Sequence, residues 1–136
     1  MLTNGIAAHL LTQSSITSLV SGGTAIQPAP APVDLSGYPC ITYKMVSDVP
    51  EYTLTGIAGL SASRIVFDCL APYNPGGYLV ARNIALAVKA ALSGYQGTLP
   101  DGTKVYFAEV VNVTDNFDNE TLLSRSSVHV MFTYSD

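Results

Sequence analysis

The side chains that most often carry chemistry in proteins are few in this sequence and lie far apart. Neither histidine, His9 or His129, has a second ligand at the i+2, i+3 or i+4 spacing that a metal site usually supplies. The two cysteines, Cys40 and Cys69, form no Cys-x-x-Cys pair and lie in alternating apolar runs. We therefore expect two buried free thiols, and the sequence predicts neither a metal site nor a catalytic residue.

Two segments resemble ligand-binding loops but have the wrong spacing. Gly97 and Gly102 are followed by Thr103 and Lys104, whereas a phosphate-binding loop places its lysine directly after the second glycine and opens a helix. The acidic run 115–120 lacks the central glycine and the closing glutamate of a calcium loop. We therefore expect no bound cofactor and interpret the acidic run as a solvent-exposed hairpin loop.

The charge composition argues against some partners and favours others. Charged residues make up 12% of the 136 residues, about half the usual fraction, and the net charge is −4. The six Lys and Arg residues are scattered singly, so they form no basic patch for nucleic-acid phosphates. Because the centres of protein interfaces are depleted in charge, the composition favours self-association.

The sequence contains no recognisable membrane or export signal. The N-terminal segment Met1–Asn4 has no basic residue, and the most apolar stretch, from Tyr78 to Leu92, is interrupted by Arg82 and Lys89. We therefore expect a soluble protein of the cytosol that makes no contact with a membrane.

Helical periodicity marks two regions. Leu2, Ile6 and Leu10 share one helical face, and the pair Ser14-Ser15 then begins a second short helix that ends near Gly22-Gly23. The main helix is predicted from about Pro75 to Leu92 and is ended by a glycine. Its apolar stripe consists of Ala81, Ile84, Ala85, Val88, Ala91 and Leu92.

Alternating apolar residues indicate strands over most of the remaining chain. The predicted strands are 40–46, 63–70, 105–113 and 126–134, with shorter ones at 24–27 and 51–54. The sequence therefore predicts a single domain over residues 1–136 of the α+β class. Its mostly antiparallel sheet of about four to five strands packs against one main helix plus short N-terminal helices.

Two segments between the predicted strands are irregular and poor in apolar periodicity, Glu51 to Ser63 and Thr114 to Thr121. We interpret both as projecting loops that become ordered on contact with other subunits. The candidate assembly residues in them are Tyr52, Gly56, Gly59, Asp115, Asp118 and Glu120.

The order of several short motifs resembles that of a known family. These motifs are Ile16 to Gly22 before a proline-rich extension, Tyr38 to Lys44, Tyr52 to Gly56, Arg64 to Cys69, the alanine-rich helix, Leu92 to Leu99, and a closing strand that ends in Tyr134. In this order the chain resembles the tail-completion, or tail-terminator, family of long-tailed bacteriophages and prophages.

The resemblance implies a structural role and supplies no catalytic residues. Proteins of this family form a homo-oligomeric ring, commonly a hexamer, that caps the tail tube, ends its polymerisation and joins the tail to the head connector. The implied partners are the tail-tube protein and the head-tail connector or stopper protein, and DNA passes through the lumen without specific binding. The implied location is the head-proximal end of the virion tail, after assembly in the host cytoplasm.

Two other functions are compatible with the same residues. One is a head-closure or stopper ring at the same junction. The other, from a different class, is a small ligand-binding or enzymatic α+β domain that uses the sheet face around Tyr43, Cys69 and His129.

Overall fold

The computed structural model describes residues 2–20, 26–29, 38–53, 56–72, 77–118 and 122–135, with side chains at all of these except 51–53, 56–59 and 118. The helices are α1 (Leu2–Leu11), α2 (Ser14–Thr17) and α3 (Gly77–Leu92). The strands are β1 (Ile26–Pro28), β2 (Cys40–Thr53), β3 (Gly56–Pro72), β4 (Gly97–Thr98), β5 (Lys104–Asp118) and β6 (Leu123–Ser135).

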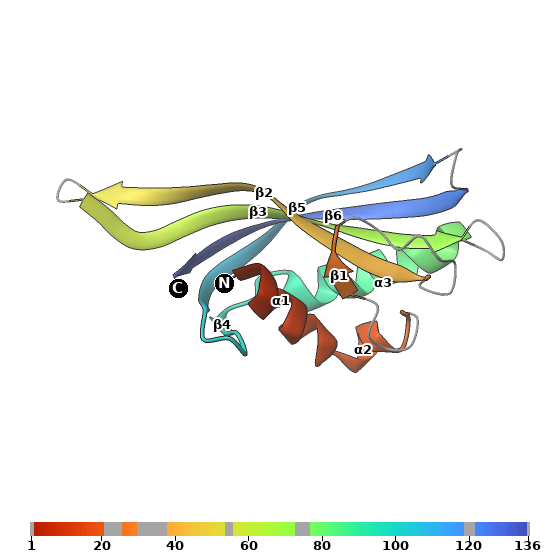
Figure 1. Ribbon diagram of the computed structural model, residues 1–136, viewed down its shortest axis with the longest axis horizontal. Coiled ribbons are helices and arrows are strands. Elements are labelled where there is room, and N and C mark those ends of the chain that lie inside the picture. Colours follow the sequence, from red (N-terminus) through yellow and green to blue (C-terminus); the bar gives the residue numbers. More distant parts are fainter. Residues whose placement is uncertain are drawn as a thin grey trace.

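The strands form one sheet in the order β1-β2-β3-β6-β5-β4, with all three helices on the same side of it (Figure 1). Only the β1–β2 pairing is parallel, and the other four pairings are antiparallel. The α+β class and the mostly antiparallel sheet are as predicted. The predicted number of strands was wrong, because the described residues form a sheet of six. The two-residue β4 is too short to show any alternation in the sequence.

Strand β2 is continuous where the sequence predicted two separate strands. Register shifts lie between Met45 and Ser47 and between Pro50 and Tyr52. At each shift, one residue of β2 has no partner in β3, and the side chains after it face the opposite way. The alternation of apolar and polar residues in the sequence therefore breaks although the strand continues. For example, Met45 pairs with Ile65 and, beyond the shift, Asp48 pairs with Ser63 on the same face.

The sequence also ended β5 too early. Residues 114–118, predicted as part of a loop, pair with residues 123–127 of β6 as regular strand. All of these residues except Phe117 are polar, and the described side chains of the segment are exposed, so burial leaves no apolar pattern in the sequence.

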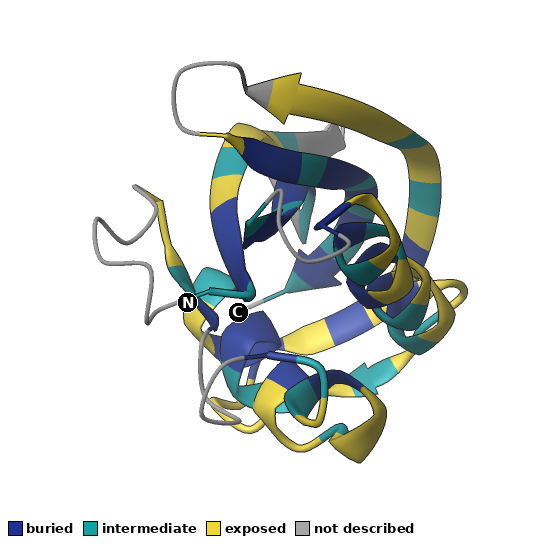
Figure 2. Cartoon of the chain, turned by 90° about the vertical axis from the view of Figure 1, so that its right-hand side faces the viewer, coloured by how far each residue is buried: buried dark blue, intermediate teal, exposed yellow. Residues whose placement is uncertain are grey.

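The core lies between the helices and the facing side of the sheet (Figure 2). Phe67, Val130 and Phe132 are fully buried there, as the predicted alternation requires. The predicted stripe of α3 is buried at Ala81, Ile84, Ala85, Val88 and Leu92, whereas Ala91 is only partly buried. None of the helices in the described part of the chain is long and apolar enough to cross a membrane.

Turn geometry fixes the connection from α3 to β5. Gly94, just after α3, has a φ of 71°, which ends the helix as predicted. The predicted turn 99–103 is also present. In it the Gly102 amide donates to the Leu99 carbonyl at 2.9 Å, and Gly102 has a φ of 95°.

Candidate assembly interface

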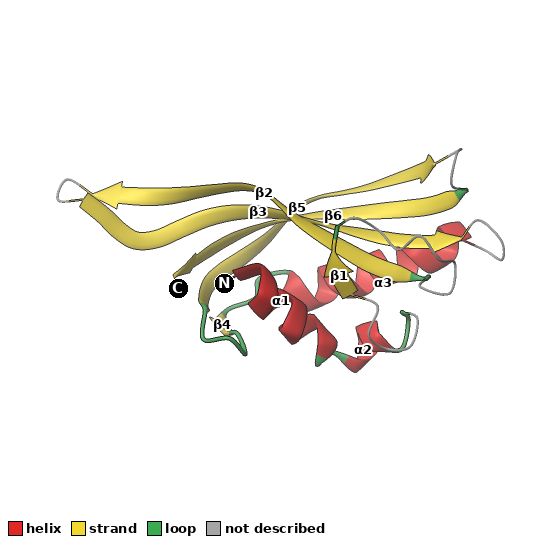
Figure 3. Ribbon diagram, in the orientation of Figure 1, coloured by secondary structure: helices red, strands yellow, loops and turns green. Residues whose placement is uncertain are grey.

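The first predicted assembly segment is not a loop but the far end of a hairpin. Tyr52 pairs with Ile57 and Gly56 pairs with Thr53, while Gly59 is part of β3. Strand β3 joins β6 only from Ser61 onward, so the hairpin beyond this residue has no further strand beside it in the described structure. The two strands therefore extend past the helices at one end of the molecule (Figure 3).

The second predicted segment lies at the opposite end of the sheet's long axis (Figure 1). Asp115 and Asp118 belong to β5, and Glu120 lies outside the described residues. Asp115 accepts a hydrogen bond from the Ser126 hydroxyl at 2.6 Å and lies 3.4 Å from the Arg82 guanidinium of α3. The structure thus separates the two predicted segments, and it anchors Asp115 to β6 and α3.

A polar cluster that the sequence did not indicate holds the hairpin at its base. The hydroxyls of Ser63 and Tyr134 donate to Asp48 Oδ1 at 2.6 and 2.9 Å. Both hydroxyl-bearing residues are buried, and their oxygens lie 3.2 Å apart. Because a carboxylate accepts stronger hydrogen bonds than a neutral group, the cluster fixes the hairpin to β6. The register shift after Met45, which places Asp48 opposite Ser63, has no signature in the sequence.

At both lateral edges of the sheet, a long stretch of strand has no neighbouring strand in the described structure. Strand β1 covers β2 only at residues 41–43, and the Ala29 amide adds a bond to the Tyr43 carbonyl. Strand β4 covers β5 only at residues 104–105, and the Gly94 amide adds a bond to the Ala108 carbonyl. Within the described residues, no strand pairs with the outer edge of β2 from Lys44 to Thr53 or with that of β5 from Glu109 to Asn116. Free edges of this length are templates for pairing with another strand.

Exposed apolar side chains gather on the same elements. Eleven large hydrophobic side chains are exposed in the described part of the chain. Two of them are on β2 (Val46, Val49), four on β5 (Tyr106, Phe107, Val111, Phe117) and three on α3 (Tyr78, Leu79, Leu86). Six of the eleven therefore lie on β2 and β5, the two strands with partly unpaired edges. Exposed apolar groups concentrated in this way mark interaction surfaces.

One signal in the sequence could have indicated the helix part of this surface. Leu79 and Leu86 are two helical turns apart, outside the predicted stripe of α3, with Arg82 and Asn83 between them. Their position opposite the buried face leaves the Leu79 side chain 65% exposed. The free strand edges had no such signal, because they follow from the order of strands in the sheet.

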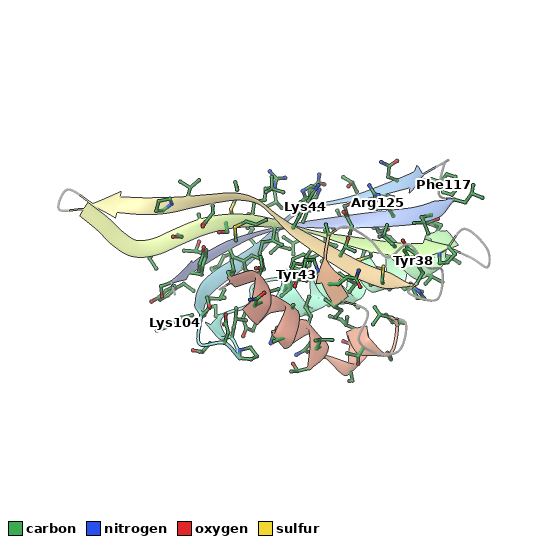
Figure 4. The ribbon with its side chains drawn as sticks, viewed as in Figure 1. Tyr38, Tyr43, Lys44, Lys104, Phe117 and Arg125 are labelled. Atoms are coloured by element: carbon green, nitrogen blue, oxygen red, sulfur yellow. The ribbon has the colours of Figure 1, made fainter. Side chains whose placement is uncertain are left out.

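The structure does not support the ligand site proposed around Tyr43, Cys69 and His129. Tyr43 and Cys69 are buried in the core on the helix side of the sheet. The register places His129 on the other face, in line with Lys44 and Val66. Figure 4 shows Lys44 and Arg125 on that face, away from the helices. The three side chains therefore do not line one site.

The cysteine thiols are free and buried, as predicted. Burial raises the pKa of Cys40 to about 11. Burial, followed by the nearby charge of Asp68, also raises the pKa of Cys69. Because only the thiolate is a good nucleophile, both groups are unreactive near neutral pH. Among the described residues, no three His, Cys, Asp or Glu side chains lie close enough together to hold a metal ion.

Comparison with known proteins identifies the family. The pattern of the family described as "Tail completion protein gp17" matches residues 4–135. A search of the curated proteins gives no match. A chain of the solved structure described as "Virion of native gene transfer agent (GTA) particle" superposes with a TM-score of 0.75 at 16% sequence identity. The superposition covers 97% of this chain and 94% of the other, so the two share a fold. The chain belongs to the tail completion protein gp17 family and is a structural protein of the virion tail.

Proposed function

We propose that this protein forms a ring, of six copies, that caps the tail tube, ends its polymerisation and joins the tail to the head connector. The observation that carries the proposal is the pair of free strand edges, on β2 and β5, at opposite sides of one sheet. A chain with two different unpaired edges associates head to tail, and such contacts close into a ring when the rotation between copies allows it. The low charge of the chain, 12%, favours the same association.

The ring acts by covering the exposed end of the tail tube. Once it occupies the exposed end of the last tube subunits, no further tube subunit can be added, and its opposite side is available to the connector. DNA passes through the lumen without specific binding, since the chain has a net charge of −4 and adhesion to phosphates needs clusters of basic groups. The resemblance to a virion component in fold is consistent with this role.

Two measurements test the proposal. Native mass spectrometry of the purified protein gives the number of copies, and we expect a closed oligomer. Electron microscopy of tail-tube protein polymerising with and without this chain gives the tube lengths. We expect the chain to end the tubes and to be found at one tip, and the core-disrupted variant Val88→Asp serves as an inactive control.

Different outcomes separate the tail-terminator role from its alternatives. A protein that stays monomeric and leaves tube length unchanged contradicts the proposal. A ring that binds the head connector but not the tube supports the stopper role instead.

A further inference from the structure

We infer that the projecting hairpin of one subunit, residues 46–62, lies on the exposed face of α3 in the next subunit. This inference rests on the proposed ring and adds a contact to it. The α3 face is a stripe of four exposed residues, Leu79, Asn83, Leu86 and Ala90. The occupant that we assign to this stripe is a second copy of the chain.

The stripe is a second, largely apolar face on a helix that already buries its first one. Its residues are spaced by four, three and four, so they lie on one side of α3, away from the buried Ala81, Ile84 and Val88. Leu79 is 65% exposed and Leu86 is 45% exposed. The solvent side of a surface helix normally carries charged or polar residues. Two exposed leucines at this spacing therefore indicate contact with another element.

The hairpin lacks the support that a two-stranded ribbon needs. Beyond the Pro50–Ser61 pair, β2 and β3 pair only with each other among the described residues, as Tyr52 does with Ile57. The ribbon extends past the helices of its own subunit (Figure 3). An isolated two-stranded hairpin is at best marginally stable in water, and a further strand or a helix packed against it makes it stable. An exposed helix face in a neighbouring copy supplies this support.

Within one subunit the hairpin and the stripe lie apart. Helix α3 begins where Gly77 approaches Pro72 at the end of β3, whereas the hairpin contains the start of that strand. Figure 1 shows the hairpin and the start of α3 at opposite ends of the molecule. A contact between them therefore joins two different surfaces of two copies, which is the head-to-tail arrangement that can close into a ring.

The charges of the two surfaces are opposite. Helix α3 carries two basic residues, Arg82 and Lys89, and no acidic residue. Residues 46–62 carry two acidic residues, Asp48 and Glu51, and no basic residue. Opposite charges on two surfaces favour their association and fix its register.

One charge on each surface is available to a neighbour. Lys89 is exposed, whereas Arg82 already has an ion pair with β5 at 3.4 Å. Asp48 is exposed, and the two hydrogen bonds that it accepts come from neutral hydroxyls. The basic residues Lys44 and Arg64 flank the hairpin at its base, but the register places them on the opposite face from Asp48. The face of the hairpin that carries Asp48 is therefore the one suited to α3.

Cysteine cross-linking tests the contact directly. Ser61→Cys/Leu86→Cys places one new thiol on the hairpin face of Asp48 and one on the stripe, and the native thiols are buried. With a short bis-maleimide reagent, we expect a ladder of covalent multimers that ends at the size of the ring. Each single variant should give no multimer, because the contact brings two different surfaces together. The control Ser61→Cys/Leu11→Cys, with its second thiol at an exposed leucine of α1, should give no ladder.

Native mass spectrometry of the same samples separates failure of the contact from failure of the ring. Rings that form without any ladder contradict the contact and leave the proposed ring intact. Covalent dimers from Leu86→Cys alone show a symmetric α3–α3 contact, which also contradicts the inference. If the unmodified protein forms no ring, the proposed function is contradicted and the contact with it.

Charged substitutions on the stripe supply a second readout. We expect Leu86→Asp to weaken ring assembly at least about tenfold, since it removes apolar contact and sets a carboxylate against an acidic hairpin. Leu11→Asp is the matched control on an exposed leucine of α1. Circular dichroism of both variants checks that the monomer stays folded. Equal ring stability in the two variants overturns the contact.

Discussion

The Tyr134 hydroxyl donates a hydrogen bond to Asp48 Oδ1 at 2.9 Å, across 86 residues of sequence. It joins the end of β6 to β2 at the base of the projecting hairpin. Ser63 of β3 donates to the same oxygen, so three strands meet at one carboxylate. The base of the hairpin is therefore joined to β6 through a cluster of three polar side chains.

Tyr134→Phe tests the strength of this cluster. Removal of one hydroxyl donor to a charged acceptor should lower the free energy of unfolding by about 1–2 kcal/mol. Urea unfolding followed by circular dichroism measures the change. Tyr106→Phe is the control, because the Tyr106 side chain is exposed and its hydroxyl lies 3.5 Å from that of Ser135. An equal effect of both variants would show that the Asp48 cluster does not stabilise the fold.

The buried face of α3 gives a second prediction. Val88 is fully buried against the sheet, so Val88→Asp places an unpaired carboxylate in the core. We expect a loss of about 3–5 kcal/mol in the free energy of unfolding. Lys89→Asp, one residue later on the exposed face, should change it by less than about 1 kcal/mol. Thermal unfolding distinguishes the two, and equal melting temperatures would mean that the helix buries a different face.

Gly77 begins α3 where the chain passes close to the end of β3. A Cβ atom at this residue would lie 2.2 Å from the Pro72 carbonyl oxygen, so backbone must move to accept it. We expect Gly77→Ala to cost about 1–3 kcal/mol through overpacking. Gly94→Ala meets no atom within 4 Å but must hold a φ of 71°, so it should cost about 1 kcal/mol. A Gly77→Ala variant as stable as the unmodified chain would contradict this close approach.

The buried thiols predict a dependence on alkaline pH. In the folded protein the pKa of Cys40 is about 11, above its ordinary value of 9.0. The unfolded chain therefore loses its proton first, and this stabilising contribution is complete below pH 9 and lost as the pH rises toward 11. Cys40→Ala should reduce the decline in melting temperature over this window. An identical decline would show that other groups cause it.

Thiol reactivity checks the same burial independently. At pH 8 we expect neither Cys40 nor Cys69 to react with a thiol reagent in the native protein, since both are buried and protonated. In denaturant without reductant, two thiols should react. Rapid modification of the native protein would place at least one of the thiols at the surface.

The sequence was informative wherever burial of one face decided the residue types. The alternation through Ile65, Phe67 and Cys69 and the stripe of α3 both follow from contact with the core, and the structure confirms both. The pattern failed where a register shift changed the facing side chains, as between Met45 and Ser47, because the period of two is then broken.

The candidate site was harder to predict than the fold. Whether an edge is free depends on which strands are neighbours, and this is decided by contacts between residues distant in sequence. The residues proposed as flexible assembly loops, including Tyr52 and Asp115, turned out to be strand residues at opposite ends of the sheet. Low apolar periodicity therefore indicated exposure correctly, but not the absence of regular structure.

The last prediction concerns the hairpin tip, residues 51–60, which we propose as an assembly contact. Beyond the Pro50–Ser61 pair the hairpin pairs with no other strand in the described structure, so its removal should leave the core unchanged. The variant joins Pro50 to Ser61 through an Asn-Gly turn, which suits a two-residue hairpin connection. It retains Asp48, Ser63 and the bond to Tyr134. The control keeps the full hairpin and carries Leu54→Asn/Thr55→Gly.

We expect the shortened chain to keep the circular dichroism spectrum of the unmodified protein and to unfold within about 1 kcal/mol of it, because the removed strand residues pair only with each other in the described structure. Particles assembled with it should have tails of uncontrolled length or tails that fail to join heads, whereas the control should support normal particles. Tail length by electron microscopy and infectious titre measure this. Normal particles from the shortened chain would contradict an assembly role for the tip. A segment that pairs only with itself should add no stability to the core. If the shortened monomer is unfolded, the tip is therefore needed for folding, and this expectation is contradicted.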